Sequence, residues 1–347
     1  MKSVLLIDFD SKIPNYALMQ LSSYYKKLSW DVTLITQTTA RNLPRDADKV
    51  FCSVIFARNH DKAAQLAKWR PDIQIGGTGW DLSSELPPEV QICKPDYDLY
   101  SAELLVNRIK GIGSREMKMA KAKALVDAGI GFTSRGCIRK CGFCVVPVKE
   151  GALRSASEIR DIINPRSNVL ILLDNNFTAD PDCLEKLREI RERNLVINLS
   201  QGIDVRLVTP EIAKALSEVK HLKKLCYAWD LPSHENIVLK GIETLSKYIK
   251  KYQHMCYMLV GFNTTFEEDL YRFKKLTEIG VDPYCMVYNQ KNDVRLRHFA
   301  RWVNSRIYKT CVFEDYVPWV KAREKMGMFV EELFIDTFLP SIAEMVS

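Results

Sequence analysis

Short, nearly continuous apolar runs alternate with helix-like segments along most of the chain, and this alternation constrains the fold more than any other feature. In the first hundred residues, strand-like runs cover 3–8, 31–36, 49–56 and 73–77, and helical spacing covers 15–30 and 61–70. Buried strands separated by helices are typical of parallel sheets. We therefore predict an N-terminal doubly wound parallel sheet. Its ligands would bind beyond the carboxyl ends of its strands, at 8–14, 56–60 and 76–80.

A change of pattern separates this region from a second alternating series. Residues 83–101 are rich in Pro, Ser and Asp and indicate a linker, and 102–129 look helical with a break at 111–113. Strand-like runs then resume, at 130–134, 168–174, 196–202, 224–230, 254–262 and 283–289. Six β/α units are fewer than the eight of a complete barrel, so a partial (β/α)6 barrel is predicted.

The remaining residues indicate a helical C-terminal extension. Its apolar face would comprise Trp319, Met326, Met328, Phe329, Leu333 and Phe334. The predicted α/β chain thus has a Rossmann-like N-terminal domain (1–100), a helical linker (101–129), the partial barrel (130–290) and the helical C-terminal region (291–347).

Composition narrows the class of protein. The 347 residues are 47% hydrophobic, enough for a sizeable core, yet no apolar run is long enough to cross a bilayer. We expect a cytoplasmic protein with no membrane partner. Of the ten cysteines, seven lie singly, which favours buried reduced thiols over a disulfide scaffold. The net charge of +7 is compatible with an acidic substrate or nucleic acid and diagnostic of neither.

The other three cysteines fall within "TSRGCIRKCGFCVVP", residues 133–147. Cys137, Cys141 and Cys144 directly follow the first strand of the second series. Structural zinc sites use four ligands, and no second cysteine pair or nearby His completes such a set. An iron–sulfur cluster held by three thiolates keeps one iron open for another ligand. The spacing therefore favours an iron–sulfur centre, and a zinc-stabilised scaffold is the alternative.

With Phe143 before the last cysteine, this segment resembles the signature of the radical S-adenosylmethionine (radical SAM) superfamily. The resemblance implies a 4Fe-4S cluster on the three cysteines, with S-adenosyl-L-methionine (SAM) on the fourth iron. One electron would cleave SAM to methionine and a 5′-deoxyadenosyl radical, which abstracts hydrogen from a substrate. An electron donor such as flavodoxin or ferredoxin is implied. The substrate, small molecule or macromolecule, and the catalytic residues of the protein stay unknown.

Three later segments carry the resemblance further. "LLDNNF" (172–177) ends the second strand where the family has a Gly-Gly-Glu-like motif, "SQGIDVRLVTPE" (200–211) follows the third, and "LVGFNTTFEED" (259–269) follows the fifth. The resemblance implies that the following residues bind the cofactor: Phe143, Asp174, Asn175, Asn176, Gln201, Asp204, Arg206 and Gly261.

The N-terminal region resembles the cobalamin-binding-type domain that precedes the radical SAM domain in one subgroup. "IGGTGWDL" followed by "PDYDLYS" carries this likeness, but the Asp-x-His-x-x-Gly cobalamin motif is absent after the first strand. Cobalamin held without a protein His ligand is an open alternative. The substrate radical could lead to cobalamin-dependent methylation, epimerisation, dehydration or ring formation. Methylthiotransferases are disfavoured, because the N-terminal domain has two cysteines, Cys52 and Cys93, where they use three.

A different class of function is nucleic-acid binding or RNA modification through the basic segment 291–309. It interleaves cationic and aromatic residues: Lys291, Arg295, Arg297, Arg301, Arg306 and Lys309 with Phe299, Trp302 and Tyr308. The alternative is an amphipathic helix that packs its apolar residues on the sheet and leaves its arginines in water.

Overall fold

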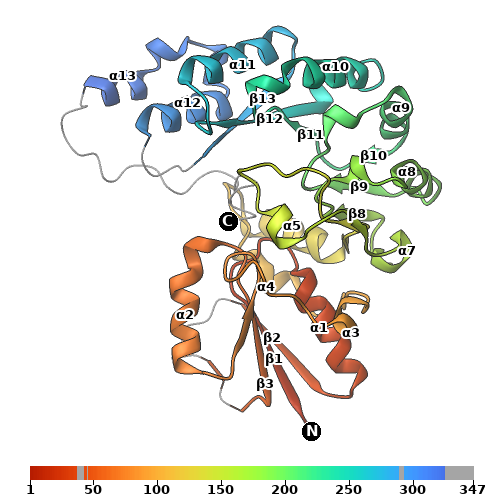
Figure 1. Ribbon diagram of the computed structural model, residues 1–347. Helices are drawn as coiled ribbons and strands as arrows, with labels where there is room; N and C mark the ends of the chain where they lie inside the picture. The colour runs from red at the N-terminus through yellow and green to blue at the C-terminus, as the bar shows by residue number, and fades with distance from the viewer. Residues whose placement is uncertain (37–42, 45, 289–292, 325–347) are drawn as a thin grey trace. The chain divides into compact units, whose positions relative to one another are not determined.

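The computed structural model describes residues 1–36, 43–44, 46–288 and 293–324, which divide into two units. Unit 1 comprises residues 1–175 and 194–200, and unit 2 comprises 176–193 and 201–324. Parallel sheets flanked by helices occur in both, which confirms the α/β class (Figure 1). The predicted boundaries at residues 100, 129 and 290 stay predictions.

The N-terminal sheet of unit 1 is parallel, in the order β2-β1-β3-β4. Its strands are β1 (Ser3–Asp8), β2 (Asp31–Thr36), β3 (Lys49–Ser53) and β4 (Gln74–Gly76), and helices α1 (Tyr16–Lys27) and α2 (His60–Trp69) lie on opposite sides of it (Figure 1). The core beneath α2 contains Leu5, Ile7, Val50 and Leu66. Strand β3 ends earlier than predicted, and the amides of Ile55 and Phe56 bond to a side chain, as described below.

Three helices connect this sheet to the cysteine-bearing segment: α3 (Pro88–Gln91), α4 (Ala102–Val106) and α5 (Arg115–Asp127). The predicted linker 83–101 therefore contains one short helix. The predicted break at 111–113 is confirmed, since Gly111 and Gly113 have φ of +99° and +158° and Ser114 caps the helix that follows.

The second sheet of unit 1 has β8 (Val169–Leu172) between β5 (Gly129–Gly131) and β9 (Val196–Leu199), all parallel. Two short strands, β6 (Ser134–Arg135) and β7 (Arg154–Ser155), pair antiparallel nearby. The helices of this segment are α6 (Val146–Lys149) and α7 (Ile159–Ile162).

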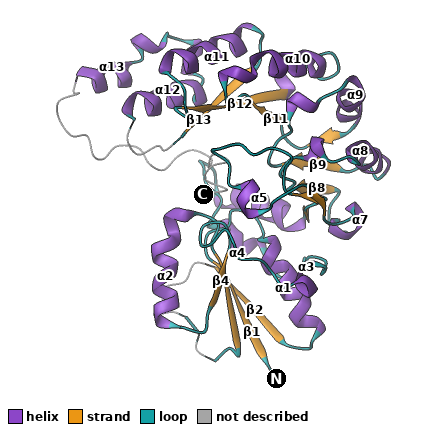
Figure 2. Ribbon diagram, in the orientation of Figure 1, coloured by secondary structure: helices purple, strands orange, loops and turns teal. Residues whose placement is uncertain are grey.

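Unit 2 contains the parallel sheet β11-β12-β13 and most of the longer helices (Figure 2). Its strands are β10 (Lys220–His221), β11 (Leu225–Ala228), β12 (His254–Val260) and β13 (Asp282–Val287). Its helices are α8 (Cys183–Glu192), α9 (Pro210–Glu218), α10 (Glu235–Ser246), α11 (Phe266–Glu278), α12 (Val294–Asn304) and α13 (Val317–Glu324). All six strands predicted after residue 130 form, most of them shorter than expected, and their closure into a partial barrel stays a prediction.

Two helices of unit 2 begin after threonine N-caps. Thr209 caps α9, and Thr265 forms a capping box with Glu268 at the start of α11. Most of the predicted apolar face of the C-terminal extension falls on residues 325–347, outside the described residues.

Two further expectations concern the single cysteines and membrane-spanning helices. Five of the seven single cysteines are buried as predicted (Cys52, Cys93, Cys183, Cys256 and Cys285), while Cys226 and Cys311 are half-buried. Within the described ranges, no helix combines the length and apolarity that a bilayer crossing requires.

Candidate functional site

The three clustered cysteines lie on a loop of unit 1 whose two ends are joined. Strand β6 enters the loop, β7 leaves it, and the two pair through Ser134 with Ser155 and Arg135 with Arg154. The amide of Cys137 donates to the carbonyl of Gly151 at 3.2 Å, just inside this pairing. Eighteen residues of chain are thereby held as a closed excursion at the carboxyl end of β5.

Gly136 makes the tight entry to this loop. Its φ is +84°, and a Cβ at this position would lie 2.2 Å from the carbonyl oxygen of Ala152. A side chain is therefore excluded by both conformation and space. The "RGC" of the sequence places glycine where the strand must turn sharply into the loop.

Inside the loop, one backbone amide bonds to a cysteine sulfur and another closes a turn between two of the cysteines. The amide of Arg139 donates to Sγ of Cys137 at 3.3 Å, and the amide of Cys144 donates to the carbonyl of Cys141 at 3.1 Å. All three cysteines and Phe143 are half-buried. An amide donor to sulfur stabilises thiolate charge, as it does in iron–sulfur proteins.

The donor chemistry of this loop fits an iron–sulfur cluster in kind: three thiols, an amide aimed at one of them, and a position next to solvent. Across the residues that the structure describes, no three His, Cys, Asp or Glu side chains lie gathered in the arrangement of metal ligands. The fit therefore rests on residue type and loop bracing and not on a preformed ligand geometry.

Asp174, the first residue of the predicted cofactor-binding triplet, is buried at the end of the second strand and holds the segment that leads into the cysteine loop. Its carboxylate accepts the Thr133 amide at 3.1 Å and hydroxyl at 2.6 Å, and the Ser134 amide at 2.6 Å and hydroxyl at 2.8 Å. Burial raises the pKa of Asp174, and these hydrogen bonds oppose the rise. The next residue, Asn175, accepts the Gly136 amide at 2.9 Å. Both side chains thus support the entry to the loop.

Sequence reasoning missed a second brace inside the loop. Arg135 forms two hydrogen bonds of 2.8 Å with the carboxylate of Glu150, and its guanidinium lies 4.4 Å from the ring centroid of Phe132. The pair joins Arg135, two residues before the first cysteine, to Glu150, the residue after α6. In the sequence, this pair is an arginine and a glutamate fifteen residues apart. Their spacing alone does not distinguish an ion pair from two separate surface charges.

Six predicted site residues belong to unit 1, namely the three cysteines, Phe143, Asp174 and Asn175; the other five belong to unit 2. In unit 2, Asn176 is buried and its side-chain oxygen accepts from Thr178 at 3.4 Å. Thr178 also accepts the Asp204 amide at 3.0 Å. Asn176 and Asp204 are therefore linked through one threonine that the sequence analysis did not single out.

Asp204 and Arg206 form a two-point ion pair within one turn. The Arg206 Nε and Nη2 atoms lie 2.6 and 3.0 Å from the two Asp204 carboxylate oxygens, and Nη1 lies 3.4 Å from Nδ1 of His234. Both residues follow β9, as the sequence predicted, and His234 is an addition to the group. Gln201 precedes them and is half-buried.

Gly261 directly follows β12 with φ of +78°, a left-handed conformation that glycine adopts without strain. Its amide donates to Asp269 at 2.9 Å and to the Thr264 hydroxyl at 3.2 Å. Asp269 is fully buried with Arg272, which also donates to the carbonyl of Leu259 at 2.7 Å. This network fixes the turn between β12 and α11.

Asp230 is a strand-end carboxylate that the predicted site did not include. It lies two residues after β11 and accepts the Leu259 amide at 3.3 Å. Burial raises its pKa to about 6, against an ordinary 3.8. A carboxyl that titrates near neutral pH at a strand end is suited to proton handling. Its position at the close of "KLCYAWD" was the signal.

Two of the three aromatic residues of the basic segment are packed inside unit 2. Phe299 has no exposed surface and Trp302 is 4% exposed, both within the aromatic cluster formed by α11 and α12. Arg295 lies 3.6 Å from the ring centroid of Phe266. The amphipathic alternative therefore describes α12, and these two rings are not accessible for stacking on bases.

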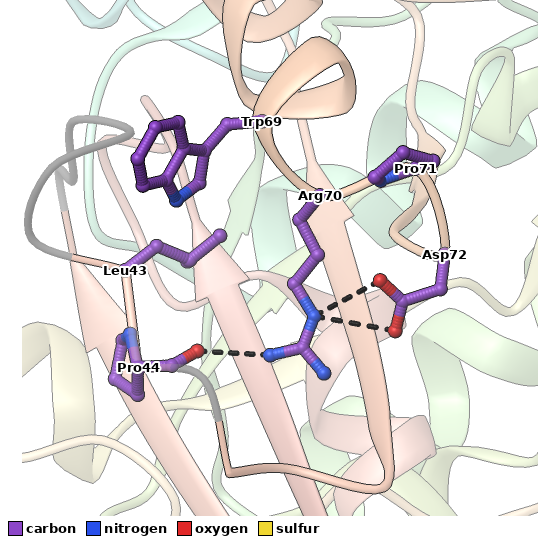
Figure 3. Close-up of a pocket in the computed structure, with 6 residues that line it drawn as sticks. All are labelled: Leu43, Pro44, Trp69, Arg70, Pro71 and Asp72. Carbon is purple, nitrogen blue, oxygen red and sulfur yellow. Dashed lines mark hydrogen bonds and ion pairs between the residues drawn. The ribbon is translucent and has the colours of Figure 1, made fainter.

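A pocket of about 470 Å³ is formed by the segments that precede β3 and β4, at the amino ends of these strands (Figure 3). It is lined by Leu43, Pro44, Trp69, Arg70, Pro71 and Asp72. Arg70 bonds to Asp72 at 3.1 and 3.2 Å and to the Pro44 carbonyl at 2.8 Å. Its guanidinium is thus engaged in holding the two lining segments together.

No protein-family model matches the sequence, and no curated protein matches it. Among solved structures, the protein is similar to SuiB of Streptococcus suis, crystallised with the precursor peptide SuiA. The sequence identity is 14% and the TM-score is 0.38, and the match covers 61% of this chain. The matched part spans 58% of the SuiB chain.

Proposed function

We propose that this protein is a radical SAM enzyme that abstracts hydrogen from a substrate still to be identified. The observation that carries the proposal is the braced loop at the carboxyl end of β5, which presents Cys137, Cys141 and Cys144 with an amide donor at the first sulfur. The partial barrel and the doubly wound N-terminal sheet belong to the same proposal. So does delivery of an electron by a donor such as flavodoxin or ferredoxin.

In this proposal the three cysteines hold a 4Fe-4S cluster. When bound and reduced, the cluster supplies one electron that breaks a carbon–sulfur bond of SAM, giving methionine and a 5′-deoxyadenosyl radical. Asp174 and Asn175 hold the loop entry at Thr133, Ser134 and Gly136. Their direct contact with SAM stays a prediction.

The predicted cofactor-binding residues of unit 2 are polar groups that suit SAM or substrate. Gln201, Asp204 and Arg206 follow β9, and Asp204 keeps the Arg206 guanidinium in one orientation through two hydrogen bonds. A fixed guanidinium is suited to a carboxylate, and a fixed carboxylate to ribose hydroxyls.

The test is anaerobic reconstitution of the full chain with iron and sulfide, followed by metal analysis and a SAM cleavage assay with dithionite. We expect about four irons per chain, as one cubane cluster requires, and formation of 5′-deoxyadenosine. Cys137→Ala, Cys141→Ala and Cys144→Ala should each abolish 5′-deoxyadenosine formation, because each removes one of three ligands.

Cys311→Ala is the matched control, since Cys311 is also half-buried but lies outside the loop. It should retain iron content and SAM cleavage. A colourless protein with one tightly held zinc that leaves SAM intact would contradict the proposal, as would wild-type turnover in the three loop variants.

A further inference from the structure

A doubly wound sheet binds its ligand at the carboxyl ends of its strands. In the N-terminal sheet, the loops at these strand ends are hydrogen-bonded to one another. Asp10, just beyond β1, accepts the Ile55 amide at 2.7 Å, the Phe56 amide at 3.1 Å and the Asn59 side-chain amide at 2.8 Å. The loops after β1 and β3 are therefore tied together by the carboxylate that a bound ligand would otherwise meet.

The glycine loop after β4 lies directly on the segment after β3. A Cβ at Gly77 would lie 2.3 Å from the carbonyl oxygen of Val54, and one at Gly79 would lie 2.4 Å from the carbonyl carbon of Phe56. The Gly79 amide donates to the Val54 carbonyl at 3.0 Å. These glycines thus permit close approach of backbone to backbone, and the space they leave is filled by the chain itself.

The end of β1 is covered by the connecting segment. Asp8 has no exposed surface, and its carboxylate accepts the Tyr100 hydroxyl at 2.7 Å and pairs with the Arg108 guanidinium at 2.8 Å. Arg108 also donates to the carbonyls of Ser11 at 2.7 Å and Asp8 at 2.5 Å, and its side chain is 6% exposed. The side chains of Tyr100 and Arg108 therefore cover the carboxyl end of β1, where a ligand of the sheet would bind.

The nearby histidine is also engaged. The His60 ring stacks on Trp80, with ring centroids 4.7 Å apart. It belongs to the start of α2 and is separated in sequence from the strand end that Asp8 occupies. A corrin ring lying on this edge would have to displace Tyr100 and Arg108. The buried Asp8 carboxylate would then keep the Ser11 amide, at 2.9 Å, but lose its cation, which is strongly unfavourable. The residues present do not fit cobalamin.

We propose that the N-terminal sheet binds no cobalamin, because the side chains of Tyr100 and Arg108 occupy the position at the end of β1 that a ligand would need. The segment 100–108 ties the sheet to the helices that lead to the cysteine-bearing strand. This inference stands independently of the radical chemistry proposed above, since it concerns the N-terminal sheet alone.

The first test is direct binding. The full chain is mixed with hydroxocobalamin, separated from free cobalamin by gel filtration, and measured for cobalt content and corrin absorbance. We expect no retained cobalamin. Retention of one equivalent by the wild-type protein would overturn the proposal, whether or not the cysteine loop carries iron.

The second test is structural. Arg108→Met should lower the melting temperature by about 10 °C, because it leaves Asp8 buried without its cation. Tyr100→Phe, which removes one hydrogen bond, should lower it by about 3 °C. Arg115→Met, on the exposed start of α5, is the matched control and should leave it unchanged. If Arg108→Met does not fold, the melting temperature of Tyr100→Phe decides the test. Melting temperatures equal to that of the wild type, in Tyr100→Phe and in Arg108→Met if it folds, would contradict the proposal.

Discussion

Two parallel sheets in unit 1 end in buried aspartates, and the two edges differ in what the aspartate holds. At the end of β1, Asp8 binds Tyr100 and Arg108, side chains that cover the edge. Beyond β8, Asp174 binds the backbone and hydroxyls of Thr133 and Ser134, which lie on the approach to a loop. The first arrangement closes an edge against ligands, and the second holds a loop that presents three thiols. A strand-end carboxylate therefore marks an edge but does not by itself make it a binding site.

The comparison depends most on Asp174. Asp174→Ala removes the acceptor of two backbone amides and two hydroxyls at a buried position, so we expect the free energy of unfolding to fall by about 4 kcal/mol. Iron loading of the reconstituted protein should fall with it, since the entry to the cysteine loop loses its support. Urea unfolding and iron analysis of the same preparation measure both effects.

Asp61→Ala is the control for this change, because the Asp61 side chain is fully exposed on α2. Its effect should stay under about 1 kcal/mol. Equal effects of the two variants would remove the distinction between an aspartate that organises a loop and one that is merely present.

A smaller change tests the loop entry itself. Gly136→Ala combines a left-handed φ with a Cβ 2.2 Å from the Ala152 carbonyl, whereas Gly151→Ala, with φ of +71°, has nothing within 4 Å of its Cβ. We expect a loss of about 3 kcal/mol for Gly136→Ala and about 1 kcal/mol for Gly151→Ala. Urea unfolding of the two variants side by side measures the difference. Indistinguishable stabilities would mean that the loop entry is not tightly held.

Asp230 of unit 2 extends the comparison to a strand-end carboxyl whose pKa is raised to about 6 by burial. Because the folded protein binds this proton more tightly than the unfolded chain, the group stabilises the fold at low pH and loses that contribution as the pH rises through 6. A shift of about two units corresponds to up to about 3 kcal/mol.

The measurement is urea unfolding of the wild type and of Asp230→Asn at several pH values between about 4 and 7. Asn does not titrate, so the variant should gain stability relative to the wild type across this window, by up to the same 3 kcal/mol. Stability curves that run parallel in pH would show that Asp230 is an ordinary ionised surface carboxylate.

The local features of this protein followed from neighbouring residues. Thr209, Ser114 and Thr265 cap helices that begin at the next residue, and Gly111 and Gly113 break the connecting helix. The strands were found because buried parallel strands are almost continuously apolar. Their ends were overestimated where a side chain took over the backbone bonds, as Asp10 does for Ile55 and Phe56.

The class of fold, the approximate positions of the strands and the grouping of three cysteines can be predicted from the sequence, because each depends on residues close together in the chain. The partner of each strand-end carboxylate became known only from the folded structure. Asp8 meets Arg108 across 100 residues and Asp174 meets Thr133 across 41, and no local pattern encodes such pairings. Burial makes an unpaired charge costly, so these distant partners determine that one edge is closed and the other holds a loop.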